Sequence, residues 1–152
     1  MINTYWDKFY KKKLKISRPS SFAKFVLNYL KKNKTLIDIG CGNGRDTFFF
    51  NRKSLSVIGV EKSKIAIDNN NKIIFQKKLK NINFKNFDIN SEKFYKVSKF
   101  DYVYSRFFIH AIPKRIETKL FKNIKKICKK NSLIFLEFRT IKDPLFKEGK
   151  KL

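Results

Sequence analysis

The stretch TLIDIGCGNG, residues 35–44, decides the fold of this chain. A short apolar run contains Asp38 near its end, and Gly40, Gly42 and Gly44 then occupy alternate positions before a segment of helical character. Glycines let the backbone approach a ligand closely, and the first turn of a helix offers free N–H groups. The stretch therefore predicts a strand, a tight turn and a helix that form a notch of nucleotide size.

A second apolar run, SVIGVE at residues 56–61, places Glu61 about 20 residues beyond the glycines. In nucleotide-binding α/β units a carboxylate at this distance accepts hydrogen bonds from two ribose hydroxyls. A solvated acid at a strand end is the alternative interpretation. The glycine spacing is G-x-G-x-G and so differs from the G-x-G-x-x-G dinucleotide fingerprint.

The glycine pattern with its preceding acid resembles motif I of the class I S-adenosylmethionine (SAM) methyltransferases. Further landmarks follow in the family's order: Glu61, Asp88 after residues 82–87, FDYVYSRFFIHAI at 100–112, and SLIFLEF at 132–138. The resemblance covers roughly residues 20–140. Within the family the chain most resembles methyltransferases encoded with capsule and other surface-carbohydrate genes, and more distantly the tellurite and thiopurine types.

Strand and helix signals alternate along the chain. Strands are expected at 35–39, 57–60, 82–87, 102–104 and 133–138, and helices are expected to begin near Pro19, Arg45, Ser63 and Pro113. Such alternation predicts an α/β, Rossmann-like, doubly wound and mostly parallel sheet with its ligand crevice at the carboxyl ends of the strands. The resemblance implies the strand order 3-2-1-4-5.

The resemblance also implies SAM as the cofactor and assigns residues to it. Asp38 would favour the ligand's ammonium, the glycine loop would hold its amino-acid end and ribose, and the Asp88 side chain and the Ile89 N–H would meet the adenine. A tight turn and an ordinary Asx turn are the alternatives for the loop and for Asp88. The cofactor-binding residues predicted in this way are Asp38, Gly40, Cys41, Gly42, Gly44, Glu61, Asp88, Ile89 and Ser105.

Catalysis and acceptor binding rest on fewer signals. Methyl transfer is an in-line displacement that depends on positioning, but an oxygen acceptor must also lose a proton. His110, the only histidine, could take that proton, or it could simply be a packing residue at a helix start. Arg18 and Arg139 could hold an anionic acceptor or the cofactor's carboxylate, or could be surface residues, and Arg106 is a further candidate for acceptor binding. No metal is predicted, because no cluster of His, Cys and acidic residues has ligand spacing.

The net charge of +25, from 37 Lys and Arg against 12 Asp and Glu, could indicate a nucleic-acid binder. Heavy use of Lys, Asn, Ile and Phe indicates A/T-rich codon bias instead, although bias does not explain the scarcity of acids. An RNA methyltransferase therefore stays an alternative, disfavoured because SRFF at 105–108 lacks an NPPY-type motif. The two cysteines have no disulfide framework spacing, which predicts a cytoplasmic location, and no membrane span or signal peptide is expected.

Residues 1–152 are expected to form a single SAM-binding domain that is incomplete at its C-terminus. Only TIKDPLFKEGKKL, residues 140–152, follows the fifth strand. That segment is too short for the helix and the antiparallel strands six and seven that class I methyltransferases add. The open edge of strand five is then expected to be covered by a partner or a second copy. A SAM-binding remnant without turnover is accordingly a further hypothesis.

Overall fold

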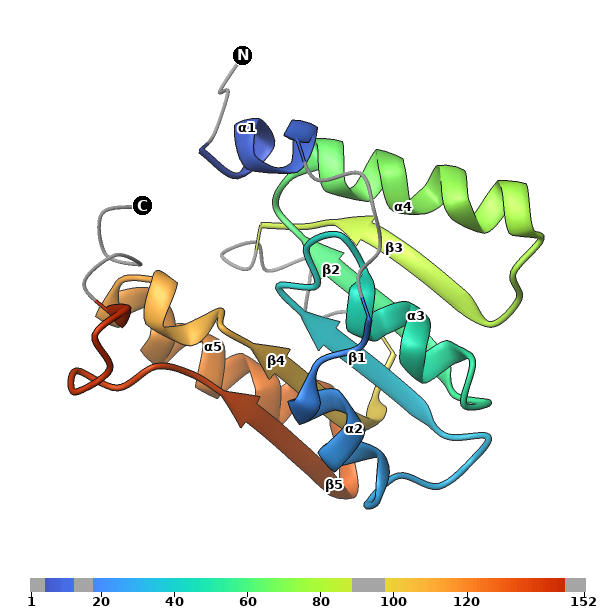
Figure 1. Cartoon of the computed structure of the whole chain (residues 1–152). Helices are drawn as coiled ribbons and strands as arrows, with labels where there is room; N and C mark the ends of the chain where they lie inside the picture. Colours follow the sequence, from blue (N-terminus) through green and yellow to red (C-terminus); the bar gives the residue numbers. More distant parts are fainter. Residues whose placement is uncertain (1–4, 13–17, 89–97, 147–152) are drawn as a thin grey trace.

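The computed structural model describes residues 5–12, 18–88 and 98–146, and its centre is a sheet of five parallel strands (Figure 1). The strand order is β3-β2-β1-β4-β5, which confirms the predicted Rossmann-like topology. The strands are β1 (Thr35–Ile39), β2 (Ser56–Glu61), β3 (Ile82–Asn86), β4 (Phe100–Arg106) and β5 (Cys128–Glu137). Strand β1 lies between β2 and β4, so the chain changes direction of winding at β1 and leaves a ligand crevice there.

Helices cover both faces of this sheet. The described helices are α1 (Tyr5–Lys12), α2 (Ser21–Leu27), α3 (Arg45–Asn51), α4 (Lys64–Lys77), the short 3-10 helix η2 (Ile109–Ala111) and α5 (Lys114–Ile127). On one face, α5 buries Leu120, Ile124 and Ile127 against β1 and β4. These three side chains recur at helical spacing, and full burial of each contributes about 1.5–3 kcal/mol.

The opposite face is covered by α2 and α3, and α4 continues this layer toward β3. Side chains of β1 alternate between the layers: Leu36 packs toward α2 and α3, and Ile37 packs toward α5. The predicted helix starts near Arg45 and Ser63 are confirmed. The Ser63 side chain accepts a hydrogen bond from the Ala66 N–H as the N-cap of α4.

The larger differences from the prediction concern α2, β5 and α1. The helix expected to begin near Pro19 has apolar residues at helical spacing as far as Leu30, but α2 ends at Leu27. The Lys31 N–H donates to the Tyr102 hydroxyl at 3.0 Å, and the chain turns into β1. Strand β5 begins at Cys128, directly after α5, and is irregular before Leu133. Helix α1 was not expected at all.

Strand β5 is an edge strand of the sheet, and none of the described residues pairs with its outer edge. Leu133, Ile134 and Phe138 are each about half exposed beside that edge. None of the described helices is both long and apolar enough to cross a membrane.

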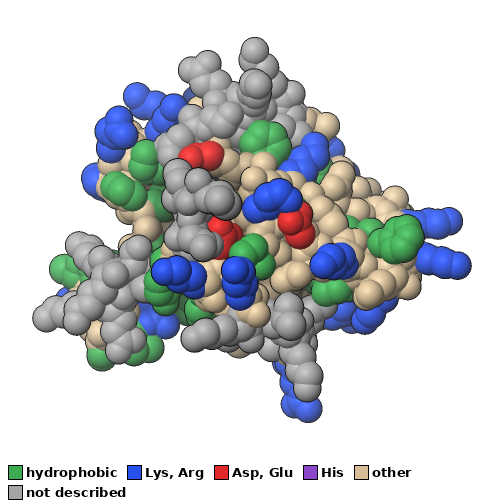
Figure 2. Space-filling view, turned by 90° about the horizontal axis from the view of Figure 1, so that it is seen from above, with side chains coloured by type: hydrophobic (Ala, Val, Ile, Leu, Met, Phe, Trp, Pro, Cys, Tyr) green, Lys and Arg blue, Asp and Glu red, His purple; other side chains and the backbone are tan. Residues whose placement is uncertain are grey.

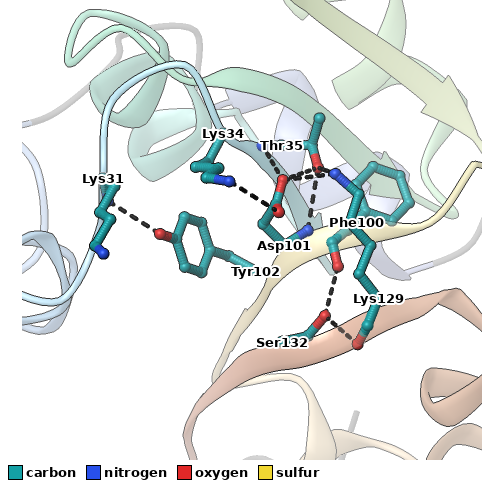
Figure 3. A network of polar contacts seen from close by, with 8 residues as sticks. All are labelled: Lys31, Lys34, Thr35, Phe100, Asp101, Tyr102, Lys129 and Ser132. Carbon is teal, nitrogen blue, oxygen red and sulfur yellow. Dashed lines mark hydrogen bonds and ion pairs between the residues drawn. The ribbon is translucent and has the colours of Figure 1, made fainter.

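Polar contacts tie β4 to its neighbours at the amino ends of the strands (Figure 3). The Asp101 carboxylate accepts hydrogen bonds from the N–H and Oγ1 of Thr35, at 2.9 and 2.7 Å, and from Lys129 Nζ at 2.8 Å. Lys34 Nζ lies 3.8 Å from its other oxygen. Burial alone would raise the pKa of Asp101, but these donors outweigh it and hold that pKa well below its usual range.

Candidate functional site

The loop between β1 and α3 has the geometry that its glycines predict. Gly40, Gly42 and Gly44 have φ angles of 76°, 52° and 72°, in the left-handed region that side chains disfavour. The Gly40 N–H donates to the Val60 carbonyl at 2.9 Å, and the Asn70 side chain donates to the Gly42 carbonyl at 2.9 Å. The loop is thus fixed to β2 and α4 at the carboxyl ends of the strands.

Glu61, the last residue of β2, faces this loop. Its carboxylate accepts hydrogen bonds from three backbone N–H groups, those of Lys62 at 2.8 Å, Ser63 at 3.0 Å and Gly42 at 3.3 Å. Burial raises the pKa of Glu61 above its usual value, although these three bonds oppose the rise. The acid predicted from spacing therefore lies against the glycine loop and is partly desolvated.

Asp38 is the second acid of the site and is 3% exposed. Its carboxylate accepts a hydrogen bond of 2.6 Å from Thr47 Oγ1, on α3. Burial raises the pKa of Asp38 to about 7, and the nearby acids Asp46 and Glu61 add to the rise, while Thr47 and Arg45 oppose it. A buried carboxylate so weakly compensated gains most from a ligand that brings positive charge.

Helix α1 covers the loop, and sequence reasoning missed this contact. A Cβ on Gly42 would collide with the Tyr10 hydroxyl, so glycine is needed there for space as well as for its φ angle. Ser63 Oγ donates to Asp7 at 2.5 Å and ties α1 to the start of α4. Burial, followed by Glu61, raises the pKa of Tyr10. The aromatic segment YWDKFY near the N-terminus was the available signal.

Other predicted cofactor residues lie around the same crevice. Asp88 follows β3 and forms an ion pair with Lys62, 3.4 Å between Nζ and Oδ2. Ser105 is buried, and its hydroxyl donates to the Ile39 carbonyl at 2.8 Å. The Cys41 side chain packs with the core of α3, α4 and β3, and its backbone N–H donates to the Val60 carbonyl at 3.1 Å. Ile89 lies outside the described residues.

Three of the predicted catalytic and acceptor residues, Arg106, His110 and Arg139, lie at or after the carboxyl ends of β4 and β5. The Phe108 side chain packs against Gly40, which connects this segment to the glycine loop. Phe107 contacts His110, with 5.8 Å between ring centroids, and the guanidinium groups of Arg106 and Arg139 lie 4.0 and 4.9 Å from its ring centroid. The structure thus brings Arg106, His110 and Arg139 together. Arg18 is exposed, before α2, and none of its contacts with the described residues places it in this group.

The two acids of the site fit the positive charges that SAM carries. Asp38 and Glu61 are partly desolvated and suit a molecule that carries an ammonium and a sulfonium. The absence of side chains at Gly40 and Gly42 leaves room for the Phe108 and Tyr10 side chains of the protein itself. Among the described residues, no group of three or more His, Cys, Asp or Glu is placed to hold a metal ion.

Solved structures share this fold. A SAM-dependent methyltransferase from Aquifex aeolicus superposes with a TM-score of 0.72 at 16% identity, over 93% of this chain and 79% of that one. Coclaurine N-methyltransferase, solved with N-methylheliamine and SAH, gives a TM-score of 0.69 at 20% identity over 78% of this chain and 35% of its own. At these identities the likeness concerns the fold alone.

Sequence relatives extend the comparison. An uncharacterized protein of Rickettsia prowazekii, RP028, is 30% identical over 110 residues, which are 70% of this chain. The chain spans 43% of that relative's length. The sequence model of the family described as "Methyltransferase domain" matches residues 30–151, from the approach to β1 through β5 and beyond. The chain therefore belongs to the methyltransferase domain family.

Proposed function

We propose that this chain binds SAM and transfers its methyl group to an oxygen atom of a small-molecule or carbohydrate-linked acceptor. The observation that carries the proposal is the convergence of the glycine loop, Asp38 and Glu61 at one crevice, where two acids are desolvated without a strong cationic partner. Capsular polysaccharide modification is the setting that the resemblance favours.

Each group at the crevice has a role in this proposal. Glu61 accepts hydrogen bonds from the ribose hydroxyls, Asp38 attracts the ammonium directly or through water, and Asp88 meets the adenine amino group. When bound, SAM supplies an activated methyl group on its sulfonium. Ser105 and Phe108 border the loop on the side toward the acceptor.

His110 acts as the general base in this proposal. Burial, with the nearby Arg139, lowers the pKa of His110, while Asp143 opposes the shift. The imidazole is therefore neutral near pH 7 and able to take the acceptor's hydroxyl proton. Phe107 and Phe146 contact the ring and orient it.

Titration calorimetry with SAM and SAH tests the cofactor assignment. We expect Glu61→Ala to weaken binding at least tenfold, because hydrogen bonds to a charged group contribute about 1.5–3 kcal/mol. Asp68→Ala is the matched control: it removes the same charge from an exposed position on α4 and should leave affinity unchanged. Equal affinity of the Glu61→Ala variant and the unaltered protein would remove Glu61 from the site.

The charge of +25 supports a second candidate, an RNA methyltransferase. Lysine and arginine side chains are spread over the face seen from above and do not gather in one block (Figure 2). We expect RNA binding, if measured, to be insensitive to sequence and to weaken steeply with salt. Tight binding of one defined RNA at physiological salt would favour this candidate. A remnant without turnover would instead bind SAM and methylate no acceptor.

A further inference from the structure

A cluster of aromatic and charged side chains lies where β4 and β5 end, beside the proposed cofactor crevice. We call Arg106, Phe107, His110, Glu137 and Arg139 the Phe107 cluster. Its members come from the segments that leave β4 and β5, and Phe108 joins it to the glycine loop through Gly40. The cofactor assignments above leave the chemistry of this cluster unexplained.

Phe107 is held in an unusual backbone conformation. Its φ is 53°, which is rare for a bulky aromatic residue. The Phe107 N–H donates to the Glu137 carbonyl at 2.7 Å, so β5 holds the conformation in place. Conformations of this kind concentrate at ligand sites, where the surrounding structure maintains them. Here the result is an aromatic ring presented between two arginines and the single histidine.

The two arginines differ in how far their charge is compensated by a neighbouring carboxylate. Arg106 forms a close ion pair with Glu137 through its Nε, so its charge is compensated inside the protein. Arg139 has only Asp143 as an ionic neighbour within the described residues, at 4.0 Å, which is beyond hydrogen-bond distance. A guanidinium has five N–H donors in a fork that suits carboxylate and phosphate. Arg139 is therefore the arginine available to an anion.

His110 provides the second, independent observation. Its Nδ1 atom is buried, and no described residue forms a hydrogen bond with it. A buried polar atom without a partner is unfavourable, so a ligand that donates a hydrogen bond there would be favoured. The charged groups that act on the imidazole are Arg139 and Asp143. Arg106 is paired with Glu137 and contacts Phe107.

We propose that the acceptor carries an anionic group, a carboxylate or a phosphate, that binds Arg139 and thereby places an acceptor hydroxyl against His110 Nδ1. The proposal rests on the proposed methyl transfer and names its substrate class. The hydroxyl proton passes to Nδ1, the acceptor oxygen forms the new bond to the methyl carbon, and the carbon–sulfur bond breaks with its electron pair staying on sulfur to give SAH. Arg106 is a positioning residue that holds Phe107.

The single histidine makes this proposal measurable without turnover. NMR titration of the His110 imidazole in the SAH-loaded protein gives its pKa with no assignment ambiguity. D-glucuronate and D-glucose 6-phosphate are the anionic probes, and D-glucose is the neutral match. We expect both anions, or the one whose geometry fits, to raise the His110 pKa, because an anion neutralises the Arg139 charge beside the ring. D-glucose should leave it unchanged.

Variants distinguish the effect of Arg139 from the effect of positive charge elsewhere on the protein. Arg139→Gln should raise the His110 pKa by itself and abolish the response to anions, and Arg139→Lys should weaken anion binding while keeping part of the response. Arg52→Gln is the control, because it removes the same charge from an exposed position after α3, at the other end of the sheet. It should change neither the His110 pKa nor its response to anions. An equal response to D-glucose, no response to either anion, or an anion response that survives Arg139→Gln would overturn the proposal. Failure of SAH to bind in calorimetry would instead overturn the proposed function.

Discussion

The two ends of the same parallel sheet treat their carboxylates in opposite ways. At the amino ends, Asp101 receives hydrogen bonds from Thr35 and Lys129, and its pKa is held well below the usual range (Figure 3). At the carboxyl ends, Asp38 and Glu61 are desolvated and their pKa values are raised. At the amino ends a lysine is among the donors to the carboxylate, whereas at the carboxyl ends the donors to Asp38 and Glu61 are a hydroxyl and backbone N–H groups. A ligand can complete the site at the carboxyl ends.

The difference has a thermodynamic sign that can be measured. Asp101 has a depressed pKa, so its contribution to stability is present above its unfolded pKa and is lost as the pH falls. Asp38 has a raised pKa, so the unfolded state releases its proton first and stability falls as the pH rises from about 4 to about 7. Replacing each acid by asparagine should therefore change stability in opposite directions near pH 8.

Asp38→Asn is the change with the largest expected effect. Near pH 8 we expect the free energy of unfolding of the ligand-free protein to increase by about 2–4 kcal/mol, because the variant no longer buries a charge. Asparagine keeps an acceptor oxygen for Thr47 Oγ1. Affinity for SAM should fall at least tenfold in the same variant. Denaturant unfolding and calorimetry measure the two quantities.

The pH dependence is the control for Asp38→Asn. The gain in stability over the unaltered protein should shrink as the pH is lowered from about 7 through about 4, because below the unfolded pKa the carboxyl is protonated in both the folded and the unfolded state. A variant that is less stable at every pH would mean that Asp38 is compensated in the folded protein, and the contrast between the two ends of the sheet would fail.

Asp101→Asn should have the opposite effect. It removes the charge that Lys129 and Thr35 hold, and hydrogen bonds to a charged group contribute about 1.5–3 kcal/mol, so we expect a loss of that order near pH 7. The loss should disappear as the pH falls below the unfolded pKa of about 4. SAM affinity should not change, since Asp101 lies at the other end of the sheet. A pH-independent loss would point to packing instead of charge.

The fold could be predicted from local signals because each signal has a direct physical cause. Apolar runs gave the five strands, and Ser63 gave the start of α4 through its side-chain cap. The early start of β5 could not be predicted, because a lysine-rich segment after α5 joins the strand only through long-range pairing with Phe100. The predicted end of α2 was wrong for a similar reason. The hydrogen bond from the Lys31 N–H to the Tyr102 hydroxyl joins residues that are far apart in the sequence.

The three glycines and Glu61 could be predicted as site residues, because the glycines lie in one short loop and Glu61 follows them at a characteristic distance in the sequence. Tyr10 was missed because its contact with Gly42 joins segments far apart in the chain, and an aromatic residue has no fixed spacing from a glycine loop. Thr47 was missed because threonine in an apolar helix gives no signal until Asp38 lies opposite it. Sequence also could not separate Arg106 from Arg139, since their ion pairs form only in the folded chain.

The smallest expected effect separates the two lysines at Asp101. Lys129 Nζ lies 2.8 Å from the carboxylate and Lys34 Nζ lies 3.8 Å away, and both side chains are more than two-fifths exposed. Exposed ion pairs contribute about 0–1 kcal/mol, so we expect Lys129→Met to lower the free energy of unfolding by less than about 1 kcal/mol and Lys34→Met by less still. Because both pairs are open to solvent, the difference between the variants and the unaltered protein should narrow at about 1 M salt. Denaturant unfolding at low and high salt measures this. If Lys34→Met lowered the free energy of unfolding as much as Lys129→Met, general attraction within a basic surface would explain the low pKa of Asp101. The close hydrogen bond from Lys129 would then not be what distinguishes this end of the sheet from the other.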